Sequence, residues 1–284
     1  MAERAISHFL DNEDAMLESH AIESPETPQG SRATLAPVWH TVVLIAGIVT
    51  VSIVGKAQMA DRHHAAHRLL TYATTALMEV LMLGWVAFGL RLRRVPLRSL
   101  FGAMGKGVRG VLADLGIAFV FWIVSLTILG TLGLVWTSVD FAVSHWSALK
   151  AGSHGVVSNP NAEQSVRAVA ELAPEDGTEI ACWVLLCCLA GIIEEAVFRG
   201  YLLRQFSAWT RGGMVWGVVF SSLLFGAAHG YQGLRNMFLL GVFGVLFSLL
   251  AILRGNLRAG IFAHSWHDLI AGLVLTFLRS RHLL

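Results

Sequence analysis

Charged side chains are scarce in this sequence. Asp, Glu, Lys and Arg make up only 14% of its 284 residues, whereas soluble domains carry about 25%. Hydrophobic residues make up 55%, and the mean hydropathy is +0.62. The net charge of +2 is too small to favour a nucleic-acid partner, and the basic residues gather in loops rather than in one stripe. These scarcities exclude a soluble domain and predict a protein that crosses the lipid bilayer several times.

Cysteine and signal-peptide features are also scarce. The chain has three cysteines, Cys182, Cys187 and Cys188, all in one apolar segment and without CxxC spacing. That placement argues against a disulfide framework and against a cysteine metal site, and it predicts buried thiols that pack. Residues 1–36 lack the basic start and apolar run of a secretory signal. They are expected to form a polar, largely disordered cytosolic tail.

Long apolar segments are abundant beyond this tail. Seven of them have the length of a membrane-crossing or nearly crossing helix: 38–55, 69–90, 112–136, 180–206, 214–229, 236–253 and 259–278. They predict an all-α fold, a polytopic membrane bundle of about seven to eight transmembrane helices. The expected organisation is N-terminal transmembrane helices over 37–136, a polar extramembrane loop over 137–179 and C-terminal core helices over 180–279.

Basic residues indicate the orientation of this bundle. The loop 91–110 contains six of the 21 Lys and Arg residues, which places it in the cytoplasm by the positive-inside tendency. The N-terminus is then inside. We expect a multi-pass integral protein of the cytoplasmic membrane of a prokaryote.

The most informative stretch is GIIEEAVFRG, residues 191–200, because two carboxylates and an arginine stand inside an apolar helix. A charge at the bilayer centre costs about 2.5–3.5 kcal/mol, so such residues usually face the bundle interior and serve a function. Glu195 and Arg199 are four apart and can pair on one helical face. Glu194 is turned by about 100° from Glu195 and has no partner within its own segment.

Further polar residues recur in other apolar segments. His229 ends the sequence FGAAH, and His264 and Asp268 share a helical face in HSWHD. A single intramembrane histidine is often satisfied by a carbonyl group, but here carboxylates, imidazoles and a guanidinium occur together on three helices of the C-terminal half. Glu79, in the second apolar segment, is expected to face the bundle in a role that the sequence does not define.

The sequences EEAVFR, FGAAH and HSWHD resemble the EExxxR, FxxxH and HxxxN/D motifs of the CPBP family of intramembrane proteases. That family includes the CAAX prenyl endopeptidases and bacteriocin-processing and immunity-associated (Abi) proteins. The resemblance covers residues 180–278. It implies a hydrolase that cleaves a peptide bond at or within the bilayer, on a peptide or protein substrate that can be lipid-modified, without a cofactor.

The resemblance also implies a role for each matching residue. Glu194 would be the general base that activates a water, helped by His229. Glu195 and Arg199 would form a supporting ion pair. His264 and Asp268 would form the oxyanion pocket. Members that act on prenylated proteins have Asn at the position of Asp268; an ionised Asp cannot donate, so Asp268 would be protonated or would fix the tautomer of His264.

The depth of His229 sets a condition on this mechanism. His229 lies about 22 Å along its helix from Met214, given a rise of about 1.5 Å per residue. If that helix began at the cytoplasmic surface, His229 would lie too far out to meet Glu194. The helix must therefore be strongly tilted, begin outside the membrane or be broken.

Three alternatives stay open. A zinc peptidase would use His229, His264 and a carboxylate as ligands, although the sequence has no HExxH. A non-catalytic peptide-binding or bacteriocin-immunity membrane protein would keep the pocket without cutting. A transporter would relay protons through the buried carboxylates, but the halves of the chain show no visible symmetry of the kind found in many transporters.

Overall fold

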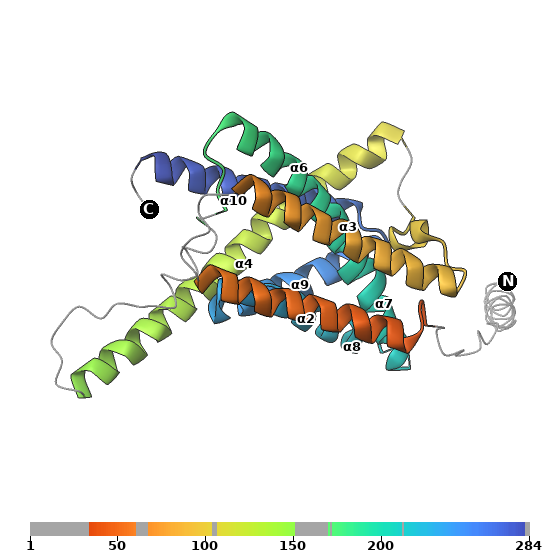
Figure 1. The fold of residues 1–284 in the computed structure, drawn as a ribbon, viewed down its shortest axis with the longest axis horizontal. Helices are drawn as coiled ribbons and strands as arrows, with labels where there is room; N and C mark the ends of the chain where they lie inside the picture. Colours follow the sequence, from red (N-terminus) through yellow and green to blue (C-terminus); the bar gives the residue numbers. More distant parts are fainter. Residues whose placement is uncertain are drawn as a thin grey trace, which may run out of the picture. The chain divides into compact units, whose positions relative to one another are not determined.

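The computed structural model describes residues 34–60, 68–103, 107–150, 170, 172–211 and 213–281. Its elements in chain order are α2 (Val38–Ala60), α3 (Arg68–Leu92), the 3₁₀ turn η2 (Leu97–Leu100), α4 (Gly107–Lys150), α6 (Gly177–Glu194), the π-helix η3 (Glu195–Leu202), α7 (Leu203–Trp209), α8 (Met214–Ala228), the 3₁₀ turn η4 (Gly230–Gln232), α9 (Leu234–Arg254) and α10 (Arg258–Ser280). The described residues form a helical bundle without strands (Figure 1).

The predicted helical membrane fold is confirmed. Six helical segments are long and apolar enough to cross a membrane, and the shorter apolar helix α8 is the seventh of the predicted segments. Residues 1–33 of the predicted N-terminal tail, and residues 151–169 and 171 of the predicted loop, lie outside the described residues. The chain is a multi-pass membrane protein.

Helix α4 differs from the expected third segment, because it does not end near residue 136 but continues to Lys150. Residues 137–150 contain polar side chains but neither glycine nor proline, so nothing in them breaks a helix. The hydroxyls of Thr137 and Ser138 donate to the carbonyl oxygens of Gly133 and Leu134, each at 2.8 Å, which satisfies them within the helix.

Local signals fix the helix ends around the C-terminal half. The Asp176 carboxylate accepts a hydrogen bond from the backbone N–H of Glu179 at 2.8 Å and caps α6. Helix α9 ends where Gly255 adopts a left-handed conformation with φ of 63°, which suits a residue without a Cβ atom. The turn that follows lets α10 return along α6 and α9.

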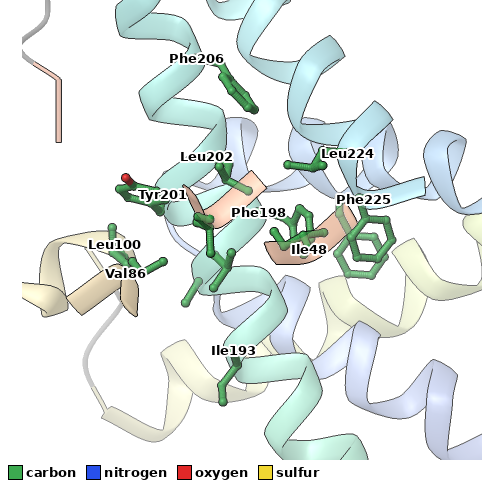
Figure 2. Close-up of a cluster of buried hydrophobic side chains, with 14 of the residues drawn as sticks. Ile48, Val86, Leu100, Ile193, Phe198, Tyr201, Leu202, Phe206, Leu224 and Phe225 are labelled. Atoms are coloured by element: carbon green, nitrogen blue, oxygen red, sulfur yellow. The ribbon is translucent and has the colours of Figure 1, made fainter. Parts of the chain in front are cut away.

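The core surrounds the rod formed by α6, η3 and α7. Every residue of η3 is buried. Figure 2 shows Ile193, Phe198, Leu202 and Phe206 along this rod, next to side chains of other helices such as Phe225. The rod is therefore enclosed by protein at the level where the polar motif lies.

Two ion-pair clusters hold helices together at other points. Asp114 of α4, whose side chain is 1% exposed, accepts from Arg254 at 2.7 Å and from Arg258 at 2.6 Å. Arg68 at the start of α3 pairs with Glu179 of α6 at 2.9 Å and also with Glu175. These clusters attach α4 to α9 and α10, and α3 to α6.

Candidate functional site

The motif segment changes helix type within the motif itself. Glu194 is the last residue of α6, and the π-helix η3 begins at Glu195. Short π-helical segments within α-helices occur frequently at functional sites. The expected continuous helix is present, but its wider turn sets the direction of the side chains from Glu195 to Leu202.

Glu195 and Arg199 form the ion pair that their spacing predicts. The distance between Arg199 Nη1 and Glu195 Oε1 is 2.8 Å, and both side chains are only 1% exposed. The guanidinium also lies over the rings of Phe225 at 4.3 Å and Phe247 at 5.0 Å. A buried pair of this kind leaves a costly lone charge when one partner is removed.

Glu195 has a second partner that the sequence did not reveal. Its Oε1 atom also lies 2.9 Å from Nδ1 of His264, which comes from α10. A carboxylate that pairs with arginine accepts hydrogen bonds, so Nδ1 of His264 is the donor. Glu195 therefore holds the His264 ring from the neighbouring helix.

The other nitrogen of His264 faces two carboxyl groups. Its Nε2 atom lies 3.6 Å from Oε2 of Glu194 and 3.6 Å from Oδ2 of Asp268. The bundle thus brings Glu194, His264 and Asp268 together, as the motifs predict. Three carboxyl groups around one imidazole suit an imidazolium that donates from both nitrogens.

His229 lies at the end of α8. Its Nδ1 atom is 2.8 Å from the carbonyl oxygen of Phe225 and must donate to it, which leaves Nε2 with a free lone pair. The Phe225 ring lies 4.9 Å from the His229 ring and 6.1 Å from the His264 ring. His229 also interacts electrostatically with Asp268. The Phe225 ring thus packs near both imidazole rings.

The length of α8 bears on the depth of His229. The helix has 15 residues and ends at Ala228, and the turn η4 then leads directly into α9. At about 1.5 Å per residue this helix spans about 22 Å, less than the roughly 30 Å of a hydrocarbon core. Helix α8 runs without a break from Met214 to Ala228, so of the three conditions that the mechanism requires the break is absent, and a strong tilt or a start outside the membrane remains.

Exposure increases across the site in one direction. The side chains of Glu195 and Arg199 are each only 1% exposed, and that of His264 is 5% exposed. The side chain of Glu194 is 13% exposed, and that of Asp268 is 32% exposed. The ion pair therefore lies behind the site, while Glu194 and Asp268 lie toward its open side. A reacting molecule would enter past these two carboxyl groups.

Two residues of this environment were not predicted as site residues. The carboxyl group of Glu79 on α3 lies within hydrogen-bonding reach of Glu194; the signal was an acidic residue in an apolar segment. Tyr231 of η4 packs near the His229 ring and interacts electrostatically with Glu79 and Glu194. Burial, together with these carboxylates, raises the pKa of Tyr231 to about 12, so its hydroxyl stays protonated at neutral pH.

The described residues contain no group of three or more His, Cys, Asp or Glu arranged to hold a metal ion. The zinc alternative would need His229, His264 and a carboxylate to converge on one point.

Comparison with known proteins gives one match. Residues 176–270 match the family model described as "Type II CAAX prenyl endopeptidase Rce1-like". No curated protein and no solved structure matches the chain. The matched segment begins at the cap of α6 and contains the three motifs and the rod that carries Glu194. Residues 176–270, about a third of the chain, are therefore similar to the Rce1-like type II CAAX prenyl endopeptidases.

Proposed function

We propose that this protein is an intramembrane endopeptidase of the CAAX-protease type, in which Glu194 activates a water molecule. The observation that supports this proposal is the position of the Glu194 carboxylate, which is partly accessible and lies 3.6 Å from Nε2 of His264. A base and an electrophilic group must both lie near the scissile carbonyl in a peptidase.

The reaction would proceed by general-base hydrolysis. Glu194 takes a proton from water as the oxygen attacks the carbonyl carbon of the scissile bond, and a tetrahedral intermediate with a negatively charged oxygen forms. Glu194 then gives that proton to the leaving amine as the C–N bond breaks. The lone pair on Nε2 of His229 accepts a hydrogen bond from the same water and orients it.

The developing oxyanion would be stabilised from α10. Nε2–H of the His264 imidazolium donates to it, while Glu195 holds the opposite nitrogen. In its protonated form, Asp268 contributes a second hydrogen-bond donor to the oxyanion, which is one of the two roles expected for it. Its open position also places it where the substrate enters.

The substrate would be a peptide or protein whose scissile bond lies at the bilayer surface or within it, with a prenylated segment as one option. Apolar helices around the site suit a substrate with a lipid-embedded part. The bias of basic residues favours an orientation with the N-terminus in the cytoplasm.

The proposal is tested with the purified full-length protein and a peptide library in detergent, with products identified by mass spectrometry. Glu194→Gln should lower kcat by a factor of about 100 to 10,000, the usual contribution of a general base. Glu179→Gln is the matched control, because it makes the same change on α6 at a residue paired with Arg68. Cleavage by the Glu194→Gln variant at the wild-type rate would contradict the proposal.

The same assay separates the alternatives. A metal chelator should leave the rate unchanged, whereas inhibition with rescue by zinc would favour a zinc peptidase. Peptide binding that is equal in wild type and Glu194→Gln, with no cleavage by either, would indicate a non-catalytic binding protein. Proton-coupled uptake that Glu194→Gln abolishes would indicate a transporter.

A further inference from the structure

Glu79 is an acidic residue near the middle of α3, within the apolar stretch ALMEVLML. Its neighbours Met78, Val80 and Leu81 are 46%, 52% and 55% exposed, as expected for side chains in contact with lipid. Glu79 itself is only partly exposed, and α3 packs against α6 (Figure 1). Glu79 therefore lies on a side of α3 that protein covers more than it covers these neighbours.

The carboxyl groups of Glu79 and Glu194 lie within hydrogen-bonding reach of each other. Two ionised carboxylates are both acceptors and cannot bond. With both ionised, Oε2 of Glu79 and Oε2 of Glu194 are each buried without a hydrogen-bond partner. A single proton held between the two groups removes this conflict, as it does where two carboxyl groups share one site.

The surrounding charges favour one shared proton. Glu79 interacts electrostatically with Glu194 and Asp268, which are both acidic, and with the protonated Tyr231. Among the residues that the structure describes, no Lys, Arg or His forms an ion pair with Glu79. Glu194, by contrast, has Nε2 of His264 at 3.6 Å. The proton therefore belongs on Glu79, and the negative charge on Glu194.

We propose that Glu79 is a positioning residue that shares one proton with Glu194 and, by donating to it, orients the Glu194 carboxylate toward the attacking water. The inference deepens the function proposed above and rests on it for its catalytic consequence. The donated hydrogen bond occupies one oxygen of Glu194. The other oxygen is then left to accept the proton from water.

The catalytic consequence is tested with two variants of Glu79. Glu79→Gln keeps a neutral donor of nearly the same shape, so it should retain most of kcat. Glu79→Met removes the donor at similar length and should lower kcat roughly 100-fold with little change in KM, the loss expected when a reacting group is displaced by about 1 Å. Glu179→Gln is the control for loss of an acidic contact between α3 and α6 and should leave kcat unchanged. Equal activity of Glu79→Met and wild type would overturn the proposal.

The shared proton is tested without any activity. Infrared spectra of the full-length protein at neutral pH, in H₂O and D₂O, should contain a band from the carboxylic acid shared by Glu79 and Glu194, distinct from the band of the protonated Asp268, which Asp268→Asn removes. Glu79→Gln and Glu194→Gln should each remove this band, because the remaining carboxylate then accepts from an amide, and Glu179→Gln should not. A band that survives in both variants, or is missing in wild type, would refute the shared proton. Failure of wild type to cleave any peptide would refute only the proposed protease function.

Discussion

Helix α4 and the rod of α6, η3 and α7 are both longer than a bilayer crossing needs, but they differ in what covers them. In the most apolar 18 residues of α4, only 11% of the residues are buried by protein. In the most apolar 18 residues of the rod, 39% are buried. The far end of α4 extends beyond its neighbouring helices (Figure 1). Little of α4 is therefore covered by the described residues, whereas protein surrounds much of the rod.

The two helices also differ in where they carry polar groups. The rod buries Glu195, Arg199 and Gln205 with partners on several helices. The buried charge of α4 is Asp114, near its start and paired with arginines of α9 and α10. A charge in a membrane is tolerated where protein supplies its partners, and only the rod offers such partners along much of its length. The family match covers this rod and not α4.

The largest expected effect on this contrast comes from Arg199→Met, which removes a charge from the centre of the rod. Glu195 would stay buried, with His264 as its remaining ion partner among the described residues, and the free energy of unfolding should fall by about 3–5 kcal/mol. Thermal unfolding in detergent measures the change. Adding Glu195→Gln should recover part of the loss, because it removes the lone charge; stability equal to wild type in Arg199→Met alone would show that the pair is not needed.

The next effect comes from Gly191→Ala, because Gly191 is where α6 and α10 approach each other. A Cβ atom there would lie 2.3 Å from Oγ of Ser265 and 3.0 Å from its backbone nitrogen. Helix α10 must shift, and His264 shifts with it. We expect a loss of about 1–3 kcal/mol in stability and up to roughly 100-fold in kcat.

Unfolding and peptide cleavage are measured on the same Gly191→Ala sample. Ser265→Gly in the same chain should restore part of both losses, since it removes the atom in closest contact. Full activity of Gly191→Ala would mean that the spacing of α6 and α10 does not position His264.

A smaller effect is expected from Tyr201→Phe, which breaks a chain of hydrogen bonds between the rod and the N-terminal helices. His40 Nε2 donates to the carbonyl of Trp85 at 2.7 Å, so its Nδ1 accepts from the Tyr201 hydroxyl at 3.1 Å. That hydroxyl accepts in turn from Thr41 at 2.8 Å, and Thr41 accepts from Gln205 at 3.1 Å.

Tyr201→Phe leaves Nδ1 of His40 without its donor and the hydroxyl of Thr41 without its acceptor, and it should lower the free energy of unfolding by about 1–3 kcal/mol. Tyr72→Phe, which removes a single bond to the carbonyl of Leu172, is the matched comparison and should cost less. Thermal unfolding of both variants measures the difference. A larger loss for Tyr72→Phe would refute the importance of the chain.

The contrast also explains which features the sequence could predict. Apolar length predicts the helices, and spacing within one helix predicts the pair of Glu195 with Arg199. The bond from Glu195 to His264 and the approach of Glu79 to Glu194 depend on how neighbouring helices are rotated, and apolar segments carry no signal for that rotation. The full length of α4 was missed because its last fourteen residues are polar enough to suggest a loop.

The smallest expected effect, and one of opposite sign, comes from Gly130→Ala on α4, the same substitution as on the rod. A Cβ atom at Gly130 meets nothing within 4 Å. Alanine loses less backbone entropy than glycine in a helix, so the variant should be more stable by about 0.5–1 kcal/mol and should cleave peptide at the wild-type rate. Thermal unfolding of Gly130→Ala and Gly191→Ala, each compared with wild type, measures whether the substitution raises or lowers stability. A loss of stability at Gly130 would mean that another protein surface, and not lipid, covers this part of α4.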